Sequence, residues 1–121
     1  MPGSDNPATD EILDWLPLPP SHFFVLFALA EGAKHGYRIM QDVKLLSNGT
    51  LCMGPATLYT TIQKLSDQGF IEETASRADD RRRTWRLRPN GKRLLGAEFS
   101  RQHDVLALAK RKRVFSAGGR A

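Results

Sequence analysis

The chain has 121 residues and a mass of 13.5 kDa, which suits about one domain and excludes a large multidomain enzyme. Hydrophobic residues make up 40% of it and charged residues 26%, a balance typical of a globular protein. No apolar run approaches the roughly 18 residues that a membrane span needs, so we expect a soluble protein with no membrane association.

The positive charge is concentrated in the second half of the chain. The formal net charge is +5, with −3 in residues 1–50 and +8 in residues 51–121. Such an asymmetry favours a polyanionic partner such as nucleic acid. The single cysteine, Cys52, excludes an internal disulfide and a CxxC metal knuckle, so no cofactor is predicted. The N-terminus lacks the cationic start and apolar stretch of a secretory signal, which indicates a cytoplasmic protein.

The chain opens with an arm and two helices. Residues 1–8 are rich in Pro, Gly, Ser, Asn and Asp, and we expect them to be disordered. A short helix is predicted over residues 10–15, and three prolines follow it. Ser21 is a good N-cap for a second, almost wholly apolar helix over residues 22–31, which we expect at the centre of the domain.

Two further helices follow. His35-Gly36 begins one whose apolar residues recur at near-helical spacing as far as Leu46. The next spans residues 53–69, with Gly54 as its cap and Gly69 as its stop. At 100° per residue one face of this helix carries Leu58, Ile62 and Leu65. The opposite face is polar and carries Ala56, Thr60, Gln63 and Lys64, flanked by Thr57 and Tyr59.

A hairpin and a long helix complete the chain. The hairpin pairs residues 70–75 with residues 84–88, where apolar and polar side chains alternate, and a charged connection joins them. The last helix runs from residues 89–91 to about Arg113 with two adjacent apolar stripes. A helix of this kind in so small a domain needs a partner surface. The residues expected at that surface, together with the N-terminal tryptophan, are Trp15, Leu94, Leu95, Phe99, Gln102, Val105, Leu106 and Ala109.

This order of elements predicts a winged helix-turn-helix, a mainly α fold with a small β-hairpin, plus a C-terminal dimerisation helix. We divide the chain into an N-terminal arm with a short helix (1–20), a DNA-binding domain (21–88), the dimerisation helix (89–113) and a flexible tail (114–121). In this fold the third helix of the DNA-binding domain, predicted over residues 53–69, fits the DNA major groove. There threonine, glutamine and lysine can contact base edges. The hairpin tip would supply cations for the phosphate backbone. Those cations are Arg77, Arg81, Arg82 and Arg83.

Three segments resemble the PadR family of bacterial transcriptional regulators. They are LPPSHFFVLFALAEGAKHGYRIMQDV, LCMGPATLYTTIQKLSDQGFIEE and RRRTWRLRPNGKRLL. The most specific parts are His35-Gly36-Tyr37, the GPATLY sequence at residues 54–59 and Gly69-Phe70-Ile71. The single C-terminal helix resembles the short subfamily. The resemblance implies a homodimer joined through its terminal helices that binds an inverted-repeat operator in double-stranded DNA and represses a neighbouring gene or operon.

Several alternatives stay open at this stage. The third helix has Lys64 as its only cation, which would also suit a winged-helix protein-interaction module without specific DNA binding. An aromatic small-molecule effector at the dimer interface is a further option, motivated by Trp15, Trp85 and Phe99. Tyr37 is expected in the core or the dimer interface, and Tyr59 either packs or contacts phosphate. An enzyme is the least favoured class, because no nucleophile–base pair, phosphate loop or metal cluster stands out.

Overall fold

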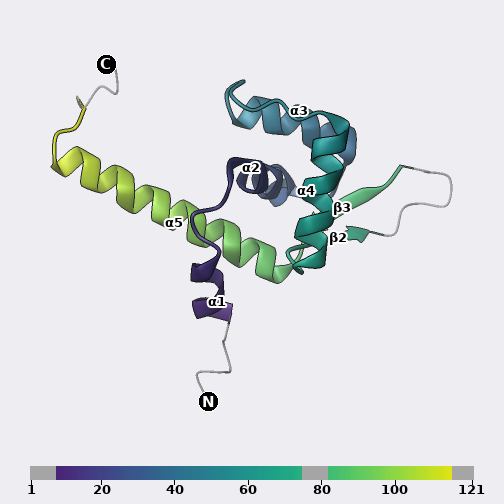
Figure 1. The fold of residues 1–121 in the computed structure, drawn as a ribbon, viewed down its shortest axis with the longest axis horizontal. Coiled ribbons are helices and arrows are strands. Elements are labelled where there is room, and N and C mark those ends of the chain that lie inside the picture. The colour runs from purple at the N-terminus through teal and green to yellow at the C-terminus, as the bar shows by residue number, and fades with distance from the viewer. Residues whose placement is uncertain (1–7, 75–81, 116–121) are drawn as a thin grey trace, which may run out of the picture.

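The computed structural model describes residues 8–74 and 82–115 (Figure 1). Ala8, which was expected in the N-terminal arm, begins α1, whereas residues 1–7, 75–81 and 116–121 lie outside the described range. Helices dominate the described part, and a small sheet completes it, as predicted. The elements in chain order are α1 (Ala8–Asp14), α2 (Pro20–Ala28), the 3-10 helix η2 (Leu29–Glu31), β1 (Lys34–His35), α3 (Gly36–Leu46), α4 (Pro55–Asp67), β2 (Ile71–Thr74), β3 (Thr84–Leu87) and α5 (Pro89–Arg111).

The sheet is antiparallel and has the strand order β1-β3-β2. The predicted hairpin is confirmed, with Glu73 of β2 opposite Trp85 of β3. The sequence analysis did not predict β1, whose Lys34 pairs with the other side of Trp85. Two residues are too few for alternating hydrophobicity to show, so β1 forms because β3 offers it an open edge. β1 thus joins the start of α3 to the base of the β2–β3 hairpin. This hairpin is the wing.

The core surrounds α2, as its apolar sequence predicted. Val25 and Leu26 are fully buried, and α2 packs against α3, α4 and α5. Figure 1 shows α2 at the centre, with α3 and α4 on one side and α5 passing on the other. The predicted cap was wrong: α2 begins at Pro20, and Ser21 lies inside its first turn. Proline suits that position because the first helical N–H groups have no partner within the helix.

The helix predicted over residues 53–69 is α4, and its ends are close to those expected. Gly54 is the N-cap, and Pro55 occupies the first helical position. Gly69 adopts a φ of 82°, which a side chain would strain, and so lets the chain turn sharply into β2. Leu58, Ile62 and Leu65 are buried, as predicted.

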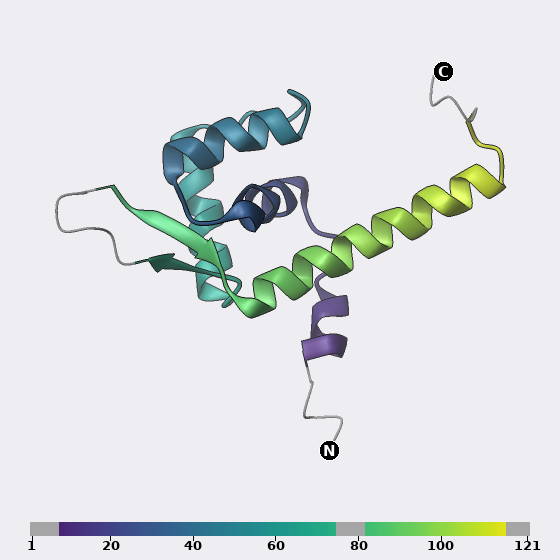
Figure 2. The same ribbon diagram turned by 180° about the vertical axis from the view of Figure 1, so that it is seen from behind.

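The long helix α5 has two unlike halves. Its proximal half, residues 89–100, packs against the domain, whereas its distal half, residues 101–111, extends beyond it in both ribbon views (Figures 1 and 2). Leu94 and Leu95 are buried in the core of a single chain, which corrects the expectation that they belong to an exposed dimerisation stripe. They are buried because α2 and β3 cover this part of α5.

A buried carboxylate marks the border between these halves. Glu98 is only 2% exposed and accepts two hydrogen bonds from the Arg101 guanidinium, at 2.9 and 2.7 Å. It also accepts one from Gln102 at 2.9 Å and a long one from the Leu18 backbone N–H at 3.4 Å. The hydrogen bonds from Arg101 lower the pKa of Glu98 in spite of its burial, and those from Gln102 and Leu18 add to the effect. The carboxylate therefore ties the segment before α2 to α5.

The N-terminal helix α1 packs across α5 (Figure 2). Ile12 is buried there, and the ring of Trp15 meets Phe70 edge-on with 5.3 Å between centroids. No helix in the described part of the chain is both long and apolar enough to cross a membrane.

Candidate nucleic-acid interface

The outer face of α4 is polar and open. Its inner face is held by four buried side chains, those of Leu58, Thr61, Ile62 and Leu65. The Thr61 hydroxyl donates to the Thr57 carbonyl at 3.0 Å. The residues predicted on the opposite face are all exposed: Ala56, Thr57, Tyr59, Thr60, Gln63 and Lys64. A rigid helix with threonine, glutamine and lysine on its outer face can present hydrogen-bonding groups to base edges in a major groove.

One side of this face forms a groove with the start of α2. The groove has a volume of about 360 Å³ and is lined by Ser21 and His22 of α2 and by Thr57, Thr60 and Lys64 of α4. Burial lowers the pKa of His22, and the positive charge of Lys64 lowers it further. The sequence analysis did not include Ser21 and His22 in the interface, because their approach to α4 depends on how the two helices cross.

Gln63 is already engaged within its own helix. Its side-chain amide donates to Asp67 one turn later at 2.8 Å, at an exposed position. A glutamine in an exposed pair of this kind can exchange its partner for a base edge at small cost, since such helix pairs stabilise by only about 0.2–0.5 kcal/mol.

Tyr59 joins α4 to both neighbouring elements. Its ring meets Trp85 of β3 edge-on at 5.7 Å, and its hydroxyl lies so close to Gly36 that a Cβ on that glycine would stand 2.5 Å away. Packing is thus one role of Tyr59, while the ring also remains partly exposed. A phosphate contact through the hydroxyl stays a prediction.

Arg83 is strongly paired in the described part of the wing. Arg83 donates two hydrogen bonds of 2.9 Å to the Glu73 carboxylate, and its guanidinium lies over the Trp85 ring at 5.0 Å. These hydrogen bonds lower the pKa of Glu73. Arg82 is exposed beside it. Arg77 and Arg81 lie outside the described residues.

Tyr37 is a surface residue of the chain, so its expected place in the core is wrong, while a contact across the dimer stays a prediction. The second turn of α3 places Ile39 inside the domain, whereas the Tyr37 side chain is 68% exposed. The helical spacing of apolar residues suggested a buried tyrosine, but position 37 lies off the face that carries Ile39 and Val43.

The predicted dimerisation residues are divided by the structure. Phe99, Val105 and Leu106 are exposed on α5, and Trp15 is exposed as well. Gln102 is half-buried and already donates to Glu98, and Ala109 is half-buried. Within residues 8–74 and 82–115, no group of three or more His, Cys, Asp or Glu side chains could hold a metal ion.

Comparison with known families identifies the group to which this fold belongs. The model of the transcriptional regulator PadR-like family matches residues 25–97, which run from α2 into the proximal half of α5. The chain belongs to this PadR-like family. Its relatives are therefore transcriptional regulators and not enzymes, and the resemblance seen in the sequence is confirmed.

Solved structures share the fold. A transcriptional regulator from Clostridium thermocellum is 20% identical with a TM-score of 0.62, covering 84% of this chain and 96% of the other. A PadR family regulator from Clostridium difficile is 14% identical with a TM-score of 0.66, covering 77% and 97%. Bacillus subtilis PadR in complex with operator DNA is 23% identical with a TM-score of 0.55, covering 63% of this chain and 44% of that one. No curated protein sequence matches this chain significantly.

Proposed function

We propose that this PadR-like protein is a homodimeric, sequence-specific DNA-binding repressor of a neighbouring gene or operon in the cytoplasm. The observation that carries the proposal is the outer face of α4, where Thr57, Thr60 and Lys64 are exposed beside a wing. Family membership supports a role in transcription, and the B. subtilis relative was solved with operator DNA.

In this proposal each region has its own task. Residues 21–88 bind DNA, residues 89–113 join two chains, and residues 1–20 support that contact. Two copies of α4 related by a two-fold axis would contact the two halves of an inverted repeat. The wing would hold the flanking phosphates without distinguishing sequences.

A gel-shift experiment tests the proposal. Wild type should bind the DNA upstream of its own gene more tightly than a shuffled duplex of equal length. Gln63→Ala should weaken binding to the upstream site by about 1–3 kcal/mol and hardly affect the shuffled duplex, because it removes a base contact. Lys64→Ala should weaken both equally, because a lysine suits a phosphate. Equal affinity of wild type for both duplexes at every salt concentration would reject specific DNA binding.

A protein-interaction module is the competing proposal. It is supported by the small number of positive charges at the predicted interface. Lys64 is the single cation on α4, and Arg83 is paired with Glu73. The interaction module predicts that wild type binds the upstream duplex and the shuffled duplex equally. The repressor predicts tighter binding to the upstream duplex.

Relief by an aromatic small molecule is a further part of the proposal. Phe99 meets Phe23 and Phe27 edge-on at 5.2 and 5.0 Å, and it remains 38% exposed. A flat aromatic ligand could stack there in the dimer interface. Titration with planar aromatic compounds should then weaken DNA binding by wild type and not by Phe99→Ala.

A further inference from the structure

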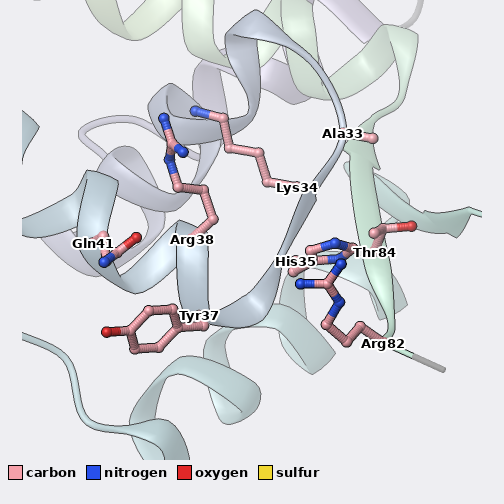
Figure 3. A pocket seen from close by; sticks show the side chains of 8 residues that line it. All are labelled: Ala33, Lys34, His35, Tyr37, Arg38, Gln41, Arg82 and Thr84. Atoms are coloured by element: carbon pink, nitrogen blue, oxygen red, sulfur yellow. The ribbon is translucent and has the colours of Figure 1, made fainter. Parts of the chain in front are cut away.

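A cleft opens between the first turns of α3 and the base of the wing (Figure 3). Its volume is about 490 Å³, and its lining includes Lys34 of β1, Tyr37, Arg38 and Gln41 of α3, and Arg82 and Thr84 at the wing. Figure 3 shows the α3 side chains on one side of the cleft and Arg82 and Thr84 on the other. The short strand β1 holds these sides together by pairing with β3.

The cleft is positive. Three of its lining residues are cations, and none of those described is acidic. Asp42 lies behind it and binds Lys34 and, at 3.1 Å, the Nε of Arg38. The two cations are unequal, since the Lys34 side chain is 12% exposed and that of Arg38 is 62% exposed. Lys34 thus neutralises the buried Asp42 carboxylate, and the Arg38 side chain stays largely exposed.

Two uncharged donors stand at the mouth of the cleft. Tyr37 and Gln41 are one helical turn apart, so their exposed side chains lie on the same side of α3. In Figure 3 the Tyr37 hydroxyl points outward on the side where Gln41 lies. A hydroxyl, an amide and guanidinium groups can all donate to one acceptor, and a phosphate offers acceptors alone.

The cleft borders the outer face of α4. Tyr59 of α4 touches Gly36, the residue immediately before Tyr37. The same Tyr59 packs on Trp85, next to Thr84 of the cleft. A duplex that lies on α4 and on the wing therefore passes the mouth of this cleft.

We propose that the cleft holds a backbone phosphate of the bound duplex, with Tyr37 and Gln41 donating hydrogen bonds and Arg38 and Arg82 supplying positive charge. The inference rests on the proposed DNA binding and adds to it a contact that does not depend on base sequence. We assign the phosphate to DNA because Tyr59 of the exposed face of α4 packs against Gly36 at the edge of the cleft. Free phosphate is the competing source.

The test adds a negative charge to the cleft without touching a buried group. Gln41→Glu should weaken binding to both the upstream duplex and a shuffled duplex by roughly fivefold at low salt and less at high salt, because a carboxylate repels the phosphate. Tyr37→Phe should weaken both by about twofold to fivefold through the lost hydrogen bond. The matched control is Asn48→Asp, which makes the same amide-to-carboxylate change at an exposed position beyond the other end of α3 and should leave affinity within twofold. Thermal unfolding checks that all three variants are folded.

The outcomes separate this inference from the proposed function. If Lys64→Ala weakens binding while Gln41→Glu behaves like Asn48→Asp, DNA binding stands and the cleft proposal is overturned. If inorganic phosphate shifts the NMR signals of Tyr37 and Gln41 but Gln41→Glu leaves DNA affinity unchanged, free phosphate is the ligand and the DNA assignment is wrong. A wild type that binds no duplex rejects the proposed function and this inference together.

Discussion

The two halves of α5 carry similar apolar sequences and have opposite surroundings. In the proximal half Leu94 is fully buried by its own chain, whereas in the distal half Leu106 remains 47% exposed. Both lie on a helix that continues without interruption from Pro89 to Arg111. Apolar spacing therefore shows that a helix face needs cover, and only the surrounding fold shows whether the same chain supplies it.

Truncation in the proximal half should have the largest effect on folding. Leu94→Ala removes packed methyl groups and leaves a cavity among buried neighbours, so we expect the free energy of unfolding to fall by about 2–5 kcal/mol. Leu106→Ala is the matched control and should cost far less in a dissociated chain. Urea unfolding followed by circular dichroism measures both. Equal losses for the two variants would erase the difference between the halves.

A charge in the distal half should act on assembly and not on the fold. Each buried leucine contributes about 1.5–3 kcal/mol, so Leu106→Asp in two chains should separate the proposed dimer while helix content is retained. Analytical ultracentrifugation at micromolar concentration gives the masses. A wild type that is already a stable monomer would contradict the dimer.

Glu98 should contribute stability that depends on pH. Because its folded pKa is lowered from the usual 4.5, this contribution is complete above that pH and is lost as the pH falls through the folded pKa. Glu98→Gln should cost about 1–3 kcal/mol at pH 7, and the gap from wild type should shrink below pH 4.5. Asp104→Asn, at an exposed position of the same helix, is the control. A gap that is the same at pH 7 and pH 3 would show that the ion pair with Arg101 adds nothing.

The smallest expected effect concerns the Arg83 guanidinium, whose positive charge is paired with Glu73 in the wing. Glu73→Gln should release the Arg83 guanidinium and strengthen binding to any duplex by a few fold, with a steeper dependence of log K on log salt. Glu72→Gln is the matched control, since Glu72 pairs instead with Arg86 at 2.8 Å. The two variants are compared by fluorescence anisotropy over a salt series. Unchanged affinity for Glu73→Gln would mean that Arg83 does not meet DNA.

Local signals in the sequence were sufficient for most of the fold. α4 begins after Gly54 and ends before Gly69, as these residues predicted, and the alternation of apolar and polar residues located β3. The same helical spacing correctly separated the buried face of α4 from its exposed face. Such signals suffice because caps, turns and periodicity act within a few residues.

Features that depend on distant packing could not be predicted in this way. The sequence shows Glu98 as an ordinary helix carboxylate, and its burial follows from contact with Leu18, eighty residues earlier. The exposure of Tyr37 depends on how α3 lies against α2. Leu94 and Leu95 were misassigned for the same reason, because nothing local distinguishes a core leucine from an interface leucine.

The most direct test of the whole account is selection of binding sites from random duplex DNA with the wild-type protein. For a two-fold dimer that presents two copies of α4, we expect enrichment of an inverted repeat. Its half-sites should be about one or two helical turns apart, roughly 10 or 20 base pairs between centres. Selection with Gln63→Ala should relax the preference at one symmetric pair of positions. Enrichment of no sequence, or of a single unpaired half-site, would contradict a two-fold regulator that uses α4 to recognise its operator.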